Sequence, residues 1–152
     1  MTAATPTRVV TELISMERTY NATPARVFAA WSDAKARERW GRPNDEEFIV
    51  YDETDFRVGG EDVSRCGPKG DLRWLARVRY MEIIQDARIV MAEHVSEAGS
   101  AKASALITVE FEPAGKATTL KLTLQIAAFD PGMAGGYNYG WTAALDNLAK
   151  EF

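Results

Sequence analysis

The feature that most constrains this chain is an apolar stripe near its C-terminal end. Its members recur at positions i, i+3, i+4, i+7 and i+11, which is one face of a helix: Trp141, Ala144, Leu145, Leu148 and Phe152. Such a helix must bury its stripe, and a sheet is the large partner that the rest of the sequence offers. A helix laid across a curved sheet leaves room for a cavity, where we expect the function.

Most of the chain before that helix alternates with the period of two that is typical of half-buried strands. In the clearest run, Trp74, Val78 and Tyr80 fall on one face. Arg77 and Arg79 fall on the other face. Further strands are predicted over residues 8–20, 46–58, 61–65, 89–95, 103–111 and 120–126. Short turns separate the later runs, which predicts an antiparallel meander.

Two short helices are predicted after the first strand. Thr23 is a good N-cap, and Pro24 suits the first helical position, where no N–H is needed. Asp33 is expected to cap a second helix that runs through Trp40. The turn Gly41–Pro43 then ends this helix.

The order of these elements predicts a single α+β domain over residues 8–152, preceded by a disordered segment over residues 1–7. A strand, two short helices, about six strands and a long helix would form an antiparallel sheet wrapped around the C-terminal helix. All the helices would then lie on the concave side of the sheet. Gly132–Gly136, just before the long helix, has two interpretations: a mobile lid, because glycine costs order, or a plain loop.

Composition excludes several classes of function. The net charge of −4 and the pI near 5.1 do not support nucleic-acid binding, which usually leaves a basic surface. No apolar run is long enough to span a bilayer, and residues 1–7 lack the apolar core of a signal peptide. Cys66 is the only cysteine, so an internal disulfide is excluded. We therefore expect a cytoplasmic protein that does not insert into membranes, with Cys66 as an incidental strand residue rather than a reactive thiol.

Signatures of enzymes are sparse, and neither a cofactor nor a metal is predicted. The sequence has no Gly-rich phosphate loop, and His94 is its only histidine. The strand phase does not say whether His94 faces the inside of the sheet. Arg57 with Asp55 either fixes the bend before Gly59 or orients a polar ligand group. Glu82 shares the phase of Tyr80, and would have a raised pKa if it lies inside the sheet. Acid–base catalysis by Arg57, Tyr80, Glu82 or His94 therefore remains an alternative.

Aromatic residues give the stronger functional signal. Tyr and Trp combine a large apolar face with one polar group, which suits a pocket for a flat or greasy ligand. The alternative is that they fill the core between helix and sheet. The predicted ligand-binding residues are Trp40, Arg57, Trp74, Tyr80, Met91, Phe129, Tyr137 and Trp141.

Four motifs, spread over most of the chain, resemble those of the activator of Hsp90 ATPase homologue family. Asn21–Asp33 is similar to its opening pattern of a small residue, Pro, Phe and Trp. Arg39–Pro43 is similar to its tryptophan-glycine-x-proline turn, although the family often has a second tryptophan where Arg39 stands. Asp55–Gly60 matches Asp-x-Arg-x-Gly-Gly, and Gly140-Trp141 with Leu145 matches the C-terminal helix.

This resemblance implies the helix-grip fold of the START-like (Bet v 1-like, SRPBCC) superfamily. It also implies binding or sequestration of a small hydrophobic ligand between the sheet and the C-terminal helix. Two other roles come with it: an enzyme of the polyketide cyclase and dehydratase type, or a co-chaperone-like module in the stress response that contacts a heat-shock ATPase. A homodimer through sheet edges or the front helices is compatible with the sequence. The family varies in its cavity, so the ligand does not transfer with the fold.

Overall fold

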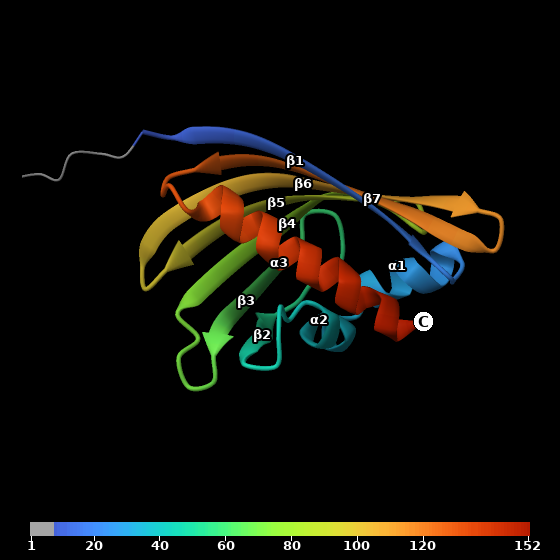
Figure 1. Ribbon diagram of the computed structural model, residues 1–152, viewed down its shortest axis with the longest axis horizontal. Helices are drawn as coiled ribbons and strands as arrows, with labels where there is room; N and C mark the ends of the chain where they lie inside the picture. The colour runs from blue at the N-terminus through green and yellow to red at the C-terminus, as the bar shows by residue number, and fades with distance from the viewer. Residues whose placement is uncertain (1–7) are drawn as a thin grey trace, which may run out of the picture.

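The computed structural model describes residues 8–152, and the disorder predicted for residues 1–7 lies outside this range. Seven strands form one antiparallel sheet in the order β1-β7-β6-β5-β4-β3-β2 (Figure 1). The strands are β1 (Val10–Tyr20), β2 (Glu47–Glu53), β3 (Glu61–Pro68), β4 (Trp74–Ile84), β5 (Arg88–Glu97), β6 (Ser100–Ala114) and β7 (Ala117–Ala128). From β2 to β7 each strand pairs with the next, and β1 pairs with β7. The predicted meander is confirmed.

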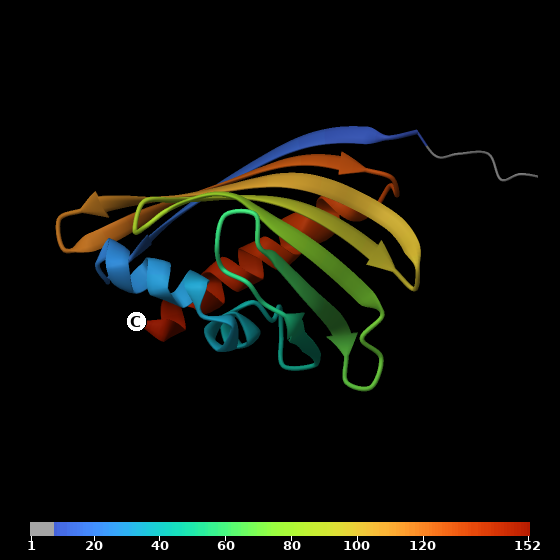
Figure 2. The same cartoon turned by 180° about the vertical axis from the view of Figure 1, so that it is seen from behind.

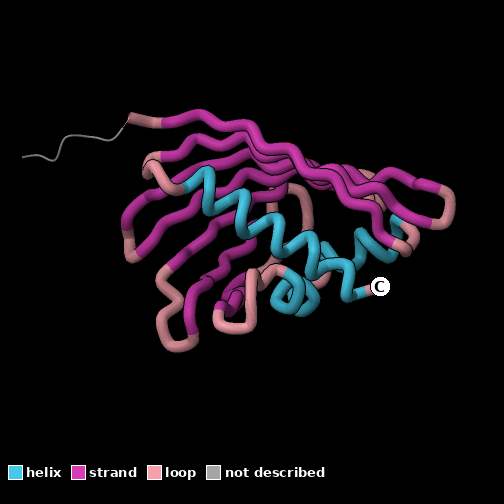
Figure 3. Tube along the Cα trace, in the orientation of Figure 1, coloured by secondary structure: helices cyan, strands magenta, loops and turns pink. Residues whose placement is uncertain are grey.

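The helices α1 (Pro24–Ser32), α2 (Ala34–Trp40) and α3 (Met133–Leu148) lie on the concave side of the sheet, and the 3₁₀ turn η1 (Ala149–Glu151) follows α3 (Figure 2). The Thr23 hydroxyl accepts a hydrogen bond from the amide of Arg26, and the Asp33 carboxylate accepts one from the amide of Lys35. Both predicted N-caps are therefore present. The tube view separates the layers clearly (Figure 3).

The core lies where β6 and β7 face the helices. Alternate residues of these strands are almost fully buried: Ala103, Ala105, Ile107, Val109, Leu120, Leu122, Leu124 and Ile126. Leu145 and Leu148 of α3 are completely buried on the other side. The Tyr20 hydroxyl of β1 donates to the backbone oxygen of Leu145 at 2.7 Å, which fixes α3 to the sheet. Each buried Leu or Ile stabilises the fold by roughly 1.5–3 kcal/mol.

Two expectations about the C-terminal region were wrong. Gly132–Gly136 is neither a lid nor a plain loop, because α3 already begins at Met133. Glycine disfavours helix by about 1 kcal/mol per residue, but burial of Met133 and Tyr137 in the core outweighs that cost. Phe152 lies beyond the helix, although its ring still packs edge-on against Tyr20 at 5.7 Å.

Two expectations about strands were also wrong. Asp55–Val58 is a loop, because the amide of Arg57 donates to the carbonyl of Asp55 and Gly60 donates back to Arg57. Gly60 is required there, since a Cβ would lie 2.1 Å from the Asp55 carbonyl oxygen. In β4 the register shifts between Tyr80 and Glu82, so Glu82 loses the phase of the inner residues.

Candidate functional site

The inner face of the sheet differs between its two ends. On β6 and β7 the inward residues are sealed against the helices. On β3 to β5 most of them keep part of their surface exposed: Ser64, Cys66, Trp74, Ala76, Val78, Glu93 and Val95. The cause is the position of α3, which packs mainly on β1, β7 and α2. We call these seven residues the open inner surface.

An acid lies in the middle of the open inner surface. Glu93 of β5 has Val78 and Ala105 as its cross-strand neighbours. The Tyr137 hydroxyl of α3 donates to Glu93 Oε1 at 2.9 Å. Burial beneath the helix raises the pKa of Glu93, and the hydrogen bond from Tyr137 opposes this only in part. The pKa of Tyr137 is raised as well, by burial and by the adjacent acid. Glu93 makes no ion pair with any of residues 8–152.

The thiol of Cys66 faces the same surface. Burial, together with the charges of Glu47 and Glu93, raises its pKa to about 11. The reactive species is the thiolate, which is scarce at neutral pH when the pKa is that high. These properties support the interpretation of Cys66 as an unreactive strand residue.

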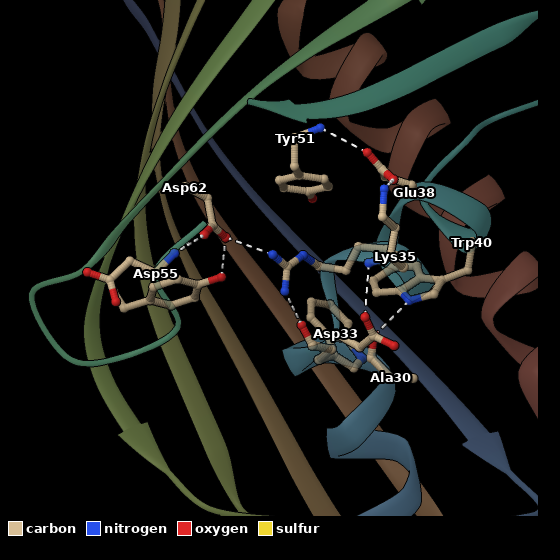
Figure 4. Close-up of polar contacts among 11 residues, drawn as sticks. Ala30, Asp33, Lys35, Glu38, Trp40, Tyr51, Asp55 and Asp62 are labelled. Carbon is tan, nitrogen blue, oxygen red and sulfur yellow. Dashed lines mark hydrogen bonds and ion pairs between the residues drawn. The ribbon is translucent and has the colours of Figure 1, made fainter. Parts of the chain in front are cut away.

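A second acid, Asp62 of β3, lies at the edge of this region and is closed in a polar network (Figure 4). Its Oδ2 atom is 3.0 Å from Arg37 Nη2 of α2 and also accepts a hydrogen bond from the Tyr80 hydroxyl. Its Oδ1 atom accepts the backbone amide of Asp55 at 3.2 Å. The Arg37 guanidinium stacks 4.6 Å from the centre of the Tyr51 ring. These contacts lock α2 onto β2 and β3.

Two of the predicted tryptophans belong to an aromatic cluster. Trp31 stacks on Trp141 at 5.7 Å, with 9° between the ring planes, and lies 4.8 Å from Trp40. Trp40 is 3% exposed, and its Nε1 donates to the carbonyl of Ala30 at 3.0 Å. Trp40 therefore fills the core at this position, whereas Trp141 is half-buried beside it.

The remaining predicted ligand-binding residues divide into separate groups. Trp74 and Tyr137 face the open inner surface, and Met91 is buried on the same face of β5. Tyr80 is 2% exposed within the Asp62 network. Phe129 is half-buried in the loop after β7. Arg57 does not join them: it lies in the β2–β3 loop, its side chain is 70% exposed, and it pairs with Asp55 at 2.8 Å.

The four candidates for acid–base catalysis lie in different parts of the structure and have different partners. His94 is exposed on the outer face, where Nδ1 lies 3.2 Å from the Ser104 hydroxyl. Glu82 pairs with Arg88 at 2.6 Å. Tyr80 and Arg57 pair with Asp62 and Asp55. Within residues 8–152 no hydrogen bond joins two of the four, so they form no catalytic group with one another.

Two hollows lie away from the open inner surface. The larger, about 650 Å³, is a shallow dish on the outer face of the sheet, around Arg77, His94 and Leu106. The smaller, about 380 Å³, lies between α2 and the end of α3, and Trp40 is the one predicted ligand-binding residue that borders it.

Comparison with known proteins assigns this chain to a family. The sequence model of the family described as activator of Hsp90 ATPase homolog 1-like protein matches residues 21–152. The chain belongs to this family. It is similar to the crystal structure of Mll3558 from Rhizobium loti, with 33% identity, 96% of this chain and 100% of that chain covered, and a TM-score of 0.86.

Two further solved structures share the fold. A protein from Rhizobium leguminosarum is 28% identical, with 95% of each chain covered and a TM-score of 0.83. CV1439 from Chromobacterium violaceum is 24% identical, with 91% of this chain and 94% of that chain covered and a TM-score of 0.81. Among curated proteins none matches the chain. No helix within residues 8–152 has the length and apolarity needed to cross a membrane.

In this family member the recognisable motifs build the closed part of the inner face. Asn21–Asp33 forms α1 and the cap of α2, and Arg39–Pro43 ends α2. Asp55–Gly60 forms the loop whose first amide binds Asp62. These motifs therefore support the helix-grip fold and leave the composition of the open inner surface to other residues.

Sequence reasoning missed four functional candidates: Arg37, Tyr51, Asp62 and Glu93. A usable signal was present for the two acids: Asp62 shares the phase of Ser64 and Cys66, and Glu93 shares that of Met91. An acid in the inward phase of a strand is expensive to bury and therefore informative.

Proposed function

We propose that this chain binds a small hydrophobic or aromatic ligand between the sheet and α3, against the open inner surface. The observation that carries the proposal is the change in exposure along one face of one sheet. Inward residues are sealed on β6 and β7, whereas the apolar residues Trp74, Val78 and Val95 on the same face keep part of their surface exposed. Apolar walls with one or two polar groups are typical of small-molecule sites.

The sequence of α3 supports this proposal. Gly140 comes three residues after Tyr137 and four before Ala144, so it flanks the buried stripe of the helix. A Cβ atom at Gly140 would meet nothing within 4 Å. Glycine disfavours the helix, yet it leaves space beside the apolar stripe where a ligand can lie.

The substitution Gly140→Leu tests this directly. The larger side chain should occupy the space beside the stripe and weaken binding of a neutral apolar dye such as Nile red by about tenfold or more. The free energy of unfolding should stay constant or rise by up to about 1 kcal/mol, because Leu favours helix over Gly. Dye titration and thermal unfolding measure the two effects separately.

Gly135→Leu is the matched control. Gly135 is exposed on the opposite side of α3, and a Cβ atom there also meets nothing within 4 Å. The control should gain the same helix stability and bind the dye like the wild type. Equal dye affinity in Gly140→Leu and Gly135→Leu would contradict the proposed location of the ligand.

Trp74→Ala and Tyr137→Ala separate lining residues from core residues. Both variants should lose more affinity than stability, and Trp74→Ala is the cleaner test because its side chain is only half-buried. If the variants lose unfolding free energy but keep their affinity for the dye, both side chains only fill the core. Native mass spectrometry of the protein purified from its own host shows in addition whether a stoichiometric apolar compound copurifies, which would identify the class of ligand.

A further inference from the structure

We propose that the ligand carries a protonated amine, and that Glu93 is its counter-ion on the open inner surface. This inference rests on the proposed function, because it requires that a ligand binds there. It names the chemical class of the ligand: an apolar or aromatic body with one cationic group.

The first support is the incomplete satisfaction of the Glu93 carboxyl group. Oε1 accepts a hydrogen bond from Tyr137, whereas Oε2 has no donor within residues 8–152. Within the same range, the completely buried side-chain atoms that lack a hydrogen-bond partner are Trp31 Nε1 and Arg37 Nε. Oε2 of Glu93 is not one of them. One carboxylate oxygen in the centre of the surface is therefore unpaired and not completely sealed.

The second support is the charge of the surroundings. The charge of Glu93 acts on Cys66, as does the charge of Glu47. It also acts on Tyr51, which lies against the Arg37–Asp62 pair. Tyr137 donates to Glu93 from α3. Arg37 is the one base in this group, and Asp62 already neutralises it. The acid thus lies among acidic and neutral groups, and the charge that this site lacks is positive.

The third support is the presence of aromatic rings on the same inner face. Trp74 is half-buried on the same face, four residues along β4 from the cross-strand neighbour of Glu93, and Tyr51 already stacks on one cation, the Arg37 guanidinium. Rings of this kind bind ammonium groups on their faces. A charge-assisted hydrogen bond to Oε2 would give the ligand its orientation, while the apolar walls hold its body.

Binding of such a ligand must be linked to protons. Without a cation nearby, burial favours the protonated form of Glu93. The positive charge of an arriving ammonium group favours the carboxylate. At a pH where Glu93 still holds its proton, that proton therefore passes to the buffer as the ion pair forms. A neutral ligand of the same shape gives no such release.

The test is isothermal titration calorimetry with two matched probes, 1-naphthylmethylamine and 1-naphthalenemethanol. Each is titrated in phosphate and in Tris at one pH, because these buffers differ in ionisation enthalpy. The amine should bind the wild type about tenfold more tightly than the alcohol. Its observed enthalpy should depend on the buffer, and that of the alcohol should not.

Glu93→Gln keeps the shape and the hydrogen bond with Tyr137 but removes the charge. It should bind the alcohol like the wild type, lose the preference for the amine and release no proton. Glu97→Gln is the matched control, since Glu97 lies at the end of the same strand on the same face. This control should keep both the preference and the proton release.

The failures are distinguishable. Suppose that both probes bind the wild type equally well, that their binding releases no proton, and that both bind more weakly to the Gly140→Leu variant. The proposed function then stands and the amine inference is overturned. A preference for the amine that survives in Glu93→Gln overturns it as well. If neither probe binds the wild type, the proposed function fails and the inference fails with it.

Discussion

Asp62 and Glu93 lie in one row across the inner face, with Val78 between them as the cross-strand neighbour of both. Each accepts a hydrogen bond from a tyrosine hydroxyl. Only Asp62 also has a guanidinium partner and a backbone amide. The same chemical group on the same surface is thus fully satisfied at one position and available at the other. This difference distinguishes an acid that holds the fold together from an acid that can bind a ligand.

The helices explain the difference. α2 brings Arg37 to within 3.0 Å of the Asp62 carboxylate, and Asp62 is only 3% exposed. Glu38 of the same helix accepts the backbone amide of Tyr51 at 3.1 Å (Figure 4). Above Glu93, α3 contributes a tyrosine and a glycine-rich turn, with no base. The inner face is closed by an ion pair at Asp62, whereas the surface at Glu93 has no such pair and can bind a ligand.

The largest expected effect comes from Arg37→Met, which removes the cation from Asp62. Breaking a buried ion pair leaves an uncompensated charge and costs about 3–5 kcal/mol. Chemical denaturation should show that loss of unfolding free energy. Arg57→Met is the control, because the Arg57–Asp55 pair is exposed and should contribute no more than about 1 kcal/mol. Similar losses in the two variants would mean that Asp62 needs its cation no more than a surface acid does.

A smaller effect separates the two tyrosines. Tyr80→Phe removes a hydrogen bond to the Asp62 carboxylate that pairs with Arg37, and should cost about 1.5–3 kcal/mol. Tyr137→Phe removes a hydrogen bond to Glu93, whose pKa is raised by burial, and should cost about 0.5–1.5 kcal/mol. Urea unfolding of the two variants checks the order. A larger loss in Tyr137→Phe would reverse the comparison and make Glu93 the more strongly held acid.

The sequence carries enough information for the fold because its local signals agree. Period-two alternation around Trp74 and Tyr80, the Thr23 cap and the stripe at Leu145 and Leu148 all predict the elements found. It also puts Asp62 in phase with Ser64 and Glu93 in phase with Met91, but it does not say which phase faces inward. It does not say that Arg37 covers one of them, because that depends on how α2 packs against β3, a contact between residues 25 positions apart.

Where the sequence failed, a nonlocal contact or a backbone detail decided the outcome. The glycines before Tyr137 predict a loop from propensity, whereas burial of Met133 makes them helical. The Asp55 loop depends on two backbone hydrogen bonds, and the bulge after Tyr80 shifts Glu82 out of phase. Alternation alone cannot reveal either feature. The candidate site was therefore predictable as a surface and not as a set of partners.

The smallest expected effect is the dependence of stability on pH that Glu93 introduces. Its pKa is raised above the ordinary value of 4.5 in the folded state, so below that value both states hold the proton and Glu93 has no effect. As the pH rises, the unfolded chain releases the proton while the folded chain keeps it, and stability falls until the pH passes the folded pKa. Glu93→Gln cannot titrate, so its stability should increase relative to the wild type over this window. Urea unfolding from pH 4 upward measures the difference between the two proteins, which cancels the carboxylates they share. Parallel curves for wild type and Glu93→Gln would mean that Glu93 is as well satisfied as Asp62, and the contrast between the two acids would fail.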